Sequence, residues 1–145
     1  MTVRISGSIL LLMSILLGSC GFLHPHVPTG GSSTGQYLVT LSDCRGNAGT
    51  QDLTVVVTVV NKGTNQKRFV GGSSDGTMAV DVTGKTLKPY SSAGVQVDLP
   101  TGVPVKVTIE RFGPIIQGTP MLRTLRVSVG SSNNIVEFRN VVIIW

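Results

Sequence analysis

The thiol of Cys20 is the side chain whose position in the sequence points most clearly to chemistry. It follows an apolar run, Ile9–Leu17, and two small residues, and Arg4 carries the only charged side chain before it. A basic start, a short apolar segment and a small-residue exit are the parts of a secretion signal. The run is shorter than the about 20 apolar residues that a membrane-spanning helix needs. We therefore expect residues 1–19 to be a cleaved signal peptide.

The segment Leu17-Gly18-Ser19-Cys20 resembles the lipobox of bacterial lipoproteins. In that family the cysteine receives a diacylglycerol, the signal is cut before it, and the new amino group is usually acylated. The resemblance implies that Cys20 is lipidated and holds the protein on the cell envelope, at the outer membrane in a Gram-negative cell. Three acyl chains, at roughly 0.8 kcal/mol per buried CH₂, give a durable anchor. The alternative is an ordinary cleaved signal, and a Cys20–Cys44 disulfide then becomes the competing interpretation.

Two short motifs match catalytic or phosphate-binding loops but lack the required setting. Gly72-Ser73-Ser74-Asp75-Gly76 matches G-x-S-x-G, yet a nucleophile elbow needs a helix after the serine and a histidine downstream. Here a strand pattern follows, and no histidine stands beyond His26. Gly84-Lys85-Thr86 has the end of a phosphate loop, but Ala79 occupies the position of the earlier glycine. We expect a flexible loop at the first motif and a hairpin at the second.

The other candidate ligands and acid–base groups are scattered. Spacing predicts neither a glycosidase pair nor a calcium site from the carboxylates, which are Asp43, Asp52, Asp75, Asp81, Asp98, Glu110 and Glu137. His24 and His26 lie on a flexible segment without a third ligand nearby, which predicts a solvated linker. Met78 and Met121 are not clustered, so core methionines are expected rather than a copper site. The sequence therefore predicts a protein that is not an enzyme and binds no metal or cofactor.

Composition and charge indicate one domain on a tether. Residues 20–145 suit a single domain. The net charge of +5 comes from dispersed basic residues, so no nucleic-acid-binding arm is expected. Two prolines and a Gly/Ser-rich run make residues 20–36 a lipidated cysteine followed by a flexible linker. The folded domain is expected over residues 37–145, with Cys44 as a small residue in a loop or at an edge.

From Tyr37 onward the apolar residues recur with a period of two, which predicts strands. The expected strands cover residues 37–41, 53–60, 67–70, 78–81, 85–88, 95–99, 105–112, 125–129 and 135–145, with a loop over 43–49 and an irregular connection over 113–120. A break is expected at Asn140. Many short strands separated by turn residues favour an all-β antiparallel sandwich. Its core is expected to run through Val55, Val57, Val107, Ile109, Val127 and Phe138.

Several turn motifs carry a resemblance to a known group of domains. A strand ends at Asn61-Lys62-Gly63, a hairpin contains Asp81 and Gly84-Lys85, and Leu99–Gly102 leads into a further strand. With the last strand around Val136–Val141, this order resembles the immunoglobulin-like domains of bacterial surface lipoproteins, the DUF4352-like group in particular. The resemblance covers about residues 37–145 and implies an immunoglobulin-like β-sandwich. The single tryptophan and the lone Cys44 depart from the Cys…Trp…Cys core of antibody domains.

These observations predict a non-enzymatic interaction module, an accessory subunit of a cell-envelope protein assembly. Sandwich edges offer unpaired backbone groups to a partner strand. The apolar final segment, Val141–Trp145, is the candidate docking element, and a buried terminal strand is the competing interpretation for it. A binding protein for a small ligand, a glycan or a metal is the alternative function.

Overall fold

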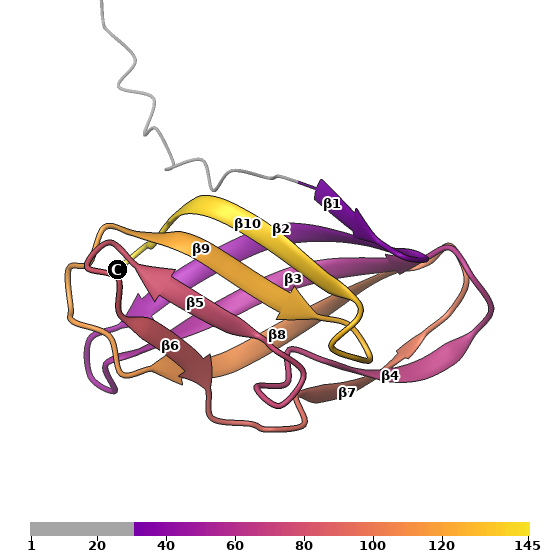
Figure 1. Cartoon of the computed structure of the whole chain (residues 1–145), viewed down its shortest axis with the longest axis horizontal. Coiled ribbons are helices and arrows are strands. Elements are labelled where there is room, and N and C mark those ends of the chain that lie inside the picture. Colours follow the sequence, from indigo (N-terminus) through magenta and orange to yellow (C-terminus); the bar gives the residue numbers. More distant parts are fainter. Residues whose placement is uncertain (1–30) are drawn as a thin grey trace, which may run out of the picture.

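The computed structural model describes residues 31–145, and every regular element in that range is a β-strand (Figure 1). Cys20, His24, His26 and the predicted signal peptide lie outside the described residues. No helix within residues 31–145 is long and apolar enough to cross a membrane. The strands are β1 (Gly31–Thr34), β2 (Tyr37–Asn47), β3 (Asp52–Asn61), β4 (Gln66–Val70), β5 (Met78–Asp81), β6 (Thr86–Pro89), β7 (Val95–Leu99), β8 (Pro104–Gly113), β9 (Met121–Ser128) and β10 (Ile135–Val142).

The strands form two antiparallel layers around one core. One layer has the order β1-β2-β3-β8 and the other the order β6-β5-β9-β10, and a short β6–β8 pairing joins them into one sheet. β4 and β7 pair separately. The two layers pack face to face as an antiparallel sandwich. The predicted all-β antiparallel fold is confirmed.

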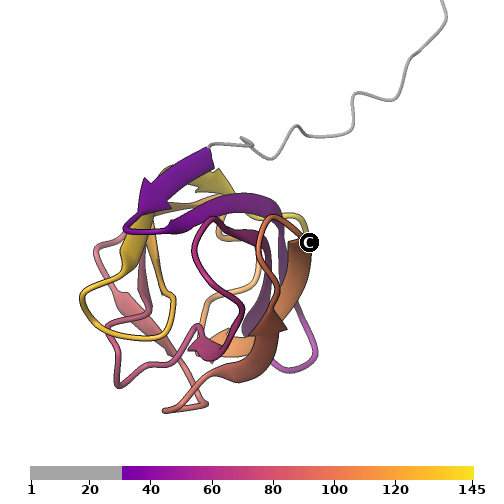
Figure 2. The same ribbon diagram turned by 90° about the vertical axis from the view of Figure 1, so that its right-hand side faces the viewer.

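The chain end brings the two layers together on their far side. The backbone N–H of Ile144 donates to the Cys44 carbonyl at 3.0 Å, and the N–H of Gly46 donates to the Ile144 carbonyl at 2.8 Å. This short parallel bridge, together with the β6–β8 pairing on the other side, makes the sandwich close to a barrel (Figure 2). The C-terminal residues therefore complete the fold.

The core follows the alternation of the strands. In β3, Val55, Val57 and Val59 are fully buried, whereas Val56 and Thr58 on the opposite face are half-buried. The six core residues expected from the sequence are all buried: Val55, Val57, Val107, Ile109, Val127 and Phe138. Register explains this, because β3 and β8 place Val57 beside Val107 and Val55 beside Ile109. The predicted inward face is confirmed.

Two local predictions around β2 are wrong. The end of the predicted linker forms β1, which pairs with β2 so that Gly31 lies opposite Thr40 and Thr34 opposite Tyr37. β2 also continues through the predicted 43–49 loop as far as Asn47, because a bulge after Leu41 shifts the register and keeps the strand paired with β3. The local sequence of both segments is rich in polar residues and glycine, which predicts coil. Pairing with a neighbouring strand nevertheless supplies hydrogen bonds to their backbone groups and makes them strands.

The C-terminal half follows its prediction with small shifts. β9 starts at Met121, four residues before the expected strand, and the connection over residues 114–120 is irregular as expected. The predicted break at Asn140 is wrong, because β10 continues through this residue to Val142 in an unshifted register with β9. Asn140 differs from its neighbours only in a positive φ of 53°. Asparagine tolerates this left-handed conformation better than most residues.

Candidate functional site

The sequence motifs with a metal-binding or copper-binding interpretation do not assemble into a site within the described residues. No group of three or more His, Cys, Asp or Glu side chains between residues 31 and 145 is placed to hold a metal ion. Met78 and Met121 are half-buried in β5 and β9, and not fully in the core as expected. Residues 31–145 therefore contain no group of side chains that supports the copper-binding interpretation.

The G-x-S-x-G match lies in the loop between β4 and β5. Its central hydroxyl, on Ser74, donates to the carbonyl of Ser92 at 2.6 Å. Gly72 is buried against the backbone of Ser92 and Ala93, where any Cβ would approach within 2.7 Å. A strand follows the loop, as predicted, so the nucleophile-elbow geometry is not formed.

The Gly84-Lys85 motif lies in the β5–β6 hairpin, as predicted. The Oδ1 atom of Asp81 accepts bonds from the Thr83 N–H at 2.8 Å, the Thr83 hydroxyl at 2.6 Å and the Lys85 N–H at 2.9 Å. Burial acts to raise the pKa of Asp81, but these bonds and the Lys85 charge outweigh it and lower the pKa. The Lys85 ammonium donates to the Pro114 carbonyl at 2.9 Å. The motif therefore stabilises a turn.

Other carboxylates pair with basic side chains. Glu137 accepts bonds from Arg139 at 2.9 Å and from Arg126 at 3.0 Å, and these bonds lower its pKa. In the same way Asp43 pairs with Arg45, Asp52 with Arg111 and Asp98 with Lys67. These contacts occur on different strands, β2, β3, β7 and β10.

Cys44 is a core residue, which corrects its predicted place in a loop or at an edge. It is free within the described residues and has no exposed surface. Burial raises the pKa of the thiol to about 12, and the neighbouring charge of Asp43 adds to this. A thiol with that pKa is protonated at neutral pH and is a poor nucleophile.

The apolar C-terminal segment divides into a buried part and an exposed tip. Val141 has no exposed surface and Ile143 is 5% exposed, so the docking-strand interpretation of Val141–Trp145 is wrong for these residues. Trp145, by contrast, is 40% exposed. Its indole N–H donates to the Thr119 carbonyl at 2.8 Å, and its ring lies against Gly46, where a Cβ would come within 2.4 Å of the ring. The tryptophan is therefore exposed and held in one orientation.

Exposed apolar and aromatic side chains gather around the β2–β3 turn. We call this surface the aromatic end and define it as Tyr90, Arg111, Ile116 and Trp145. Ile116 is 67% exposed and belongs to the turn whose Thr119 carbonyl accepts the Trp145 bond. Tyr90 is 56% exposed, and the Arg111 guanidinium lies over its ring at 4.9 Å from the centroid.

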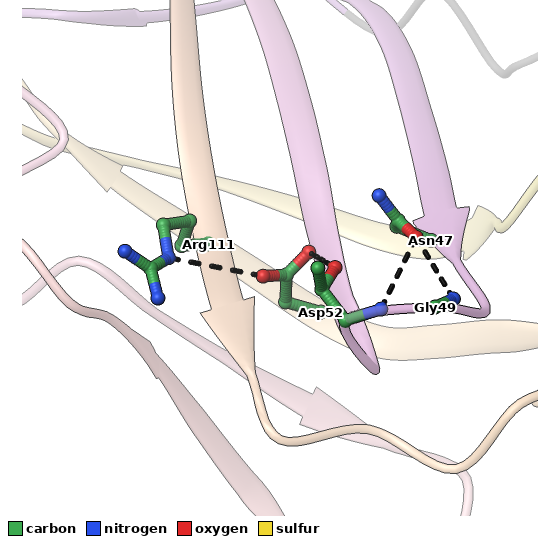
Figure 3. A network of polar contacts seen from close by, with 5 residues as sticks. Asn47, Gly49, Asp52 and Arg111 are labelled. Carbon is green, nitrogen blue, oxygen red and sulfur yellow. Dashed lines mark hydrogen bonds and ion pairs between the residues drawn. The ribbon is translucent and has the colours of Figure 1, made fainter.

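A polar network fixes the base of the aromatic end (Figure 3). The side-chain oxygen of Asn47 accepts bonds from the N–H groups of Gly49 and Thr50 at 2.9 and 3.2 Å, which closes the β2–β3 turn. The Thr50 hydroxyl donates to Asp52 at 2.7 Å, and Asp52 lies 4.0 Å from the Arg111 guanidinium. Arg111 has a positive φ of 61°, so the network holds it in an uncommon backbone conformation.

A polar cleft of about 420 Å³ lies at the opposite end of β2. Its walls come from the β1–β2 turn, from the start of β4 and from the loop between β9 and β10, and its polar side chains are Gln36, Tyr37, Gln66, Arg68, Ser131 and Asn134. Sequence reasoning missed this cleft, because its residues come from three segments far apart in the chain. The local signals were Gly35 and Gly130, two turn glycines that border the cleft and have positive φ values of 54° and 77°.

Comparisons with protein-family models, with curated proteins and with solved structures find no match to this chain. The resemblance to immunoglobulin-like lipoprotein domains therefore stays a prediction from its turn motifs. The two ends of the sandwich are the candidate functional surfaces of the described residues.

Proposed function

We propose that this protein is a lipid-anchored, non-enzymatic interaction module of the bacterial cell envelope, and that it docks to a protein partner through the aromatic end. The predicted lipid on Cys20 provides the membrane attachment, and residues 21–30 lead from it to the domain. The protein acts there as an accessory subunit of an envelope protein assembly.

The exposed and rigid Trp145 is the observation that carries the proposal. Its 40% exposure leaves a large apolar surface in water, while the bond to Thr119 and the packing on Gly46 fix its orientation. Tryptophan, tyrosine and arginine dominate the energetics of protein interfaces, and a side chain that is already ordered loses little entropy on binding. Ile116 extends the apolar surface beside it.

The chemistry of the aromatic end also describes the partner. Trp145 and Ile116 suit an apolar pocket, whereas the exposed Arg111 favours acidic groups around that pocket. The net positive charge of the chain, which stays positive after Arg4 is removed with the signal, acts in the same direction. An apolar pocket with an acidic rim is therefore the partner surface that we propose.

Co-purification from membranes tests the proposal. The full-length protein is extracted in mild detergent, and its size is compared for the wild type, Trp145→Ala and Ile116→Asp. We expect the wild type in a defined complex larger than its own monomer, and we expect both variants to be released as monomers that still melt cooperatively.

Phe69→Ala is the matched control, because Phe69 is 42% exposed and lies on β4, away from the aromatic end. This variant should stay in the complex. A wild type that remains monomeric, or a complex that survives both Trp145→Ala and Ile116→Asp, contradicts the proposal.

A further inference from the structure

The polar cleft carries a positive charge that no carboxylate within the described residues neutralises. Arg68 is the only charged residue in its walls, and no ion pair forms between Arg68 and a residue of the described range. Its Nε–H lies 3.4 Å from the Tyr37 hydroxyl, while its side chain is exposed. The terminal N–H groups of a guanidinium form a planar fork that matches a carboxylate.

The position of Arg68 over the cleft depends on Gly130. A Cβ on Gly130 would lie 2.7 Å from the Arg68 Cδ atom, and Gly130 has a positive φ of 77° that side chains rarely adopt. The N–H of Gly130 donates to the Phe69 carbonyl at 2.7 Å, which fixes the β9–β10 loop against β4. The arginine therefore lies on a backbone surface that only glycine provides.

Gln66 adds a buried hydrogen-bond donor without an acceptor. Its side-chain nitrogen Nε2 is inaccessible to solvent and has no partner among the described residues. Buried donors are almost always paired, because leaving one unpaired destabilises the folded state. Gln66 lines the cleft, so a rotation of its side chain that turns Nε2 into the cleft would let the hydroxyl or carbonyl oxygen of a ligand accept this bond.

The rim of the cleft is ordered before any ligand binds. The Gln36 amide donates to the side-chain oxygen of Asn61 at 3.0 Å and packs on Gly63. Asn134 approaches the β1–β2 turn so closely that a Cβ on Gly35 would come within 3.0 Å of its side-chain oxygen. Fixed amides reduce the entropy lost when a ligand is bound.

We propose that the polar cleft binds a small hydroxylated carboxylate, the chemistry of a sugar acid. Arg68 pairs with the carboxylate, while Gln66, Ser131 and Asn134 hydrogen-bond the hydroxyl groups. The volume of about 420 Å³ falls within the range of small-molecule sites. The polar side chains in the walls favour a ligand that is hydroxylated throughout over an apolar acid. This site is separate from the aromatic end and goes beyond the proposed docking function.

Titration calorimetry on the full-length protein in detergent tests the site with three probes. D-glucuronate carries both the carboxylate and the hydroxyl groups, D-glucose lacks the charge, and acetate lacks the hydroxyl groups. We expect glucuronate to bind with a dissociation constant on the order of 1 mM, and each of the other probes to bind about tenfold more weakly or not at all.

Three variants assign the binding to the cleft. Arg68→Gln should weaken glucuronate binding about tenfold or more, whereas Arg123→Gln, which removes an exposed arginine near the start of β9, should leave it unchanged. Gln66→Met should weaken binding and raise the melting temperature of the free protein, because the unpaired buried donor is removed.

Four results overturn the proposal: no binding of glucuronate at 20-fold above the expected constant of about 1 mM, equal binding of glucose, equal binding of acetate, or glucuronate binding that survives Arg68→Gln. The aromatic-end variants serve as an independent check, since Trp145→Ala should bind glucuronate as the wild type does. A failure of docking through the aromatic end therefore leaves the cleft proposal standing, and the reverse also holds.

Discussion

Asp81 stabilises the β5–β6 hairpin by accepting three hydrogen bonds on one carboxylate oxygen. The side chain is 2% exposed, and the bonds come from Thr83 and Lys85 in the following turn. The charged form of the carboxylate is the better acceptor, which is why the turn lowers its pKa despite the burial. A single residue thus couples the conformation of a turn to pH.

Asp81→Asn keeps an oxygen acceptor but removes the charge, so it should change how stability depends on pH. Because the pKa of Asp81 is lower in the folded state than the ordinary value of 3.8, the unfolded state binds the proton more readily. The stabilisation is present above pH 3.8 and is lost as the pH falls through the lower, folded-state value. Urea denaturation between pH 7 and pH 2 should show a smaller loss of unfolding free energy for Asp81→Asn than for the wild type. Equal pH dependence of the two proteins would contradict this role of Asp81.

Replacement of Cys44 by serine should destabilise the domain by about 1–3 kcal/mol, because it buries a hydroxyl that lacks an assigned partner in the core. Cys44→Ala is the control, since it leaves a small cavity but buries no polar group, and about 1 kcal/mol is expected for it. Urea denaturation of both variants gives the comparison. If Cys44→Ser proves as stable as the wild type, the thiol does not lie in the core.

At the scale of the element, β3 organises the sandwich by pairing with both β2 and β8. Its β-branched residues favour an extended backbone, and its alternation gives it one apolar face that is buried between the two layers. β1 is the opposite case, since its Gly/Ser sequence has weak strand propensity and its structure depends on the pairing with β2.

Val57→Asp should unfold the domain or lower its stability by about 4 kcal/mol or more, because it buries an unpaired carboxylate in the centre of β3. Thr58→Asp is the matched control on the outer face, where the register places residue 58 opposite Lys106. Val56 shares that face, but it lies opposite Asp43, whose charge would repel a new carboxylate. Far-UV circular dichroism with thermal melting should show cooperative unfolding for Thr58→Asp and its loss for Val57→Asp. A cooperatively melting Val57→Asp protein would show that the inward face is assigned wrongly.

At the scale of the whole molecule, the C-terminal segment links the two layers through Ile144 and exposes Trp145 beyond them. Deletion of Val141–Trp145 should therefore unfold the domain, whereas Trp145→Ala should leave it folded. Circular dichroism of the two proteins measures this difference. A folded deletion variant would indicate that the segment is an added docking strand and not part of the core.

The whole-molecule proposal also requires the lipid on Cys20. The mass of the intact protein purified from membranes should correspond to a chain that starts at Cys20 and carries diacylglycerol and an N-acyl group. Cys20→Ser should lack this added mass and should not partition into detergent. An unmodified chain that starts at Met1, or cleavage after Cys20, would contradict the anchor.

The sequence by itself determined most of the strands and the inward faces of β3 and β8. Both follow from local patterns, since alternation in β3 and turn residues at Asn61 and Gly84 act within a few residues. The predicted core residues and the β5–β6 hairpin were correct for this reason.

Only the tertiary structure decided which residues from distant segments meet. Cys44 is buried because a bulge carries β2 onward beside β3, and β1 forms because β2 offers it free backbone groups. The Trp145–Thr119 bond and the cleft around Arg68 likewise join segments that no local pattern relates. Burial, exposure and the binding surfaces depend on long-range pairing, because a side chain's environment is set by the strands packed against it.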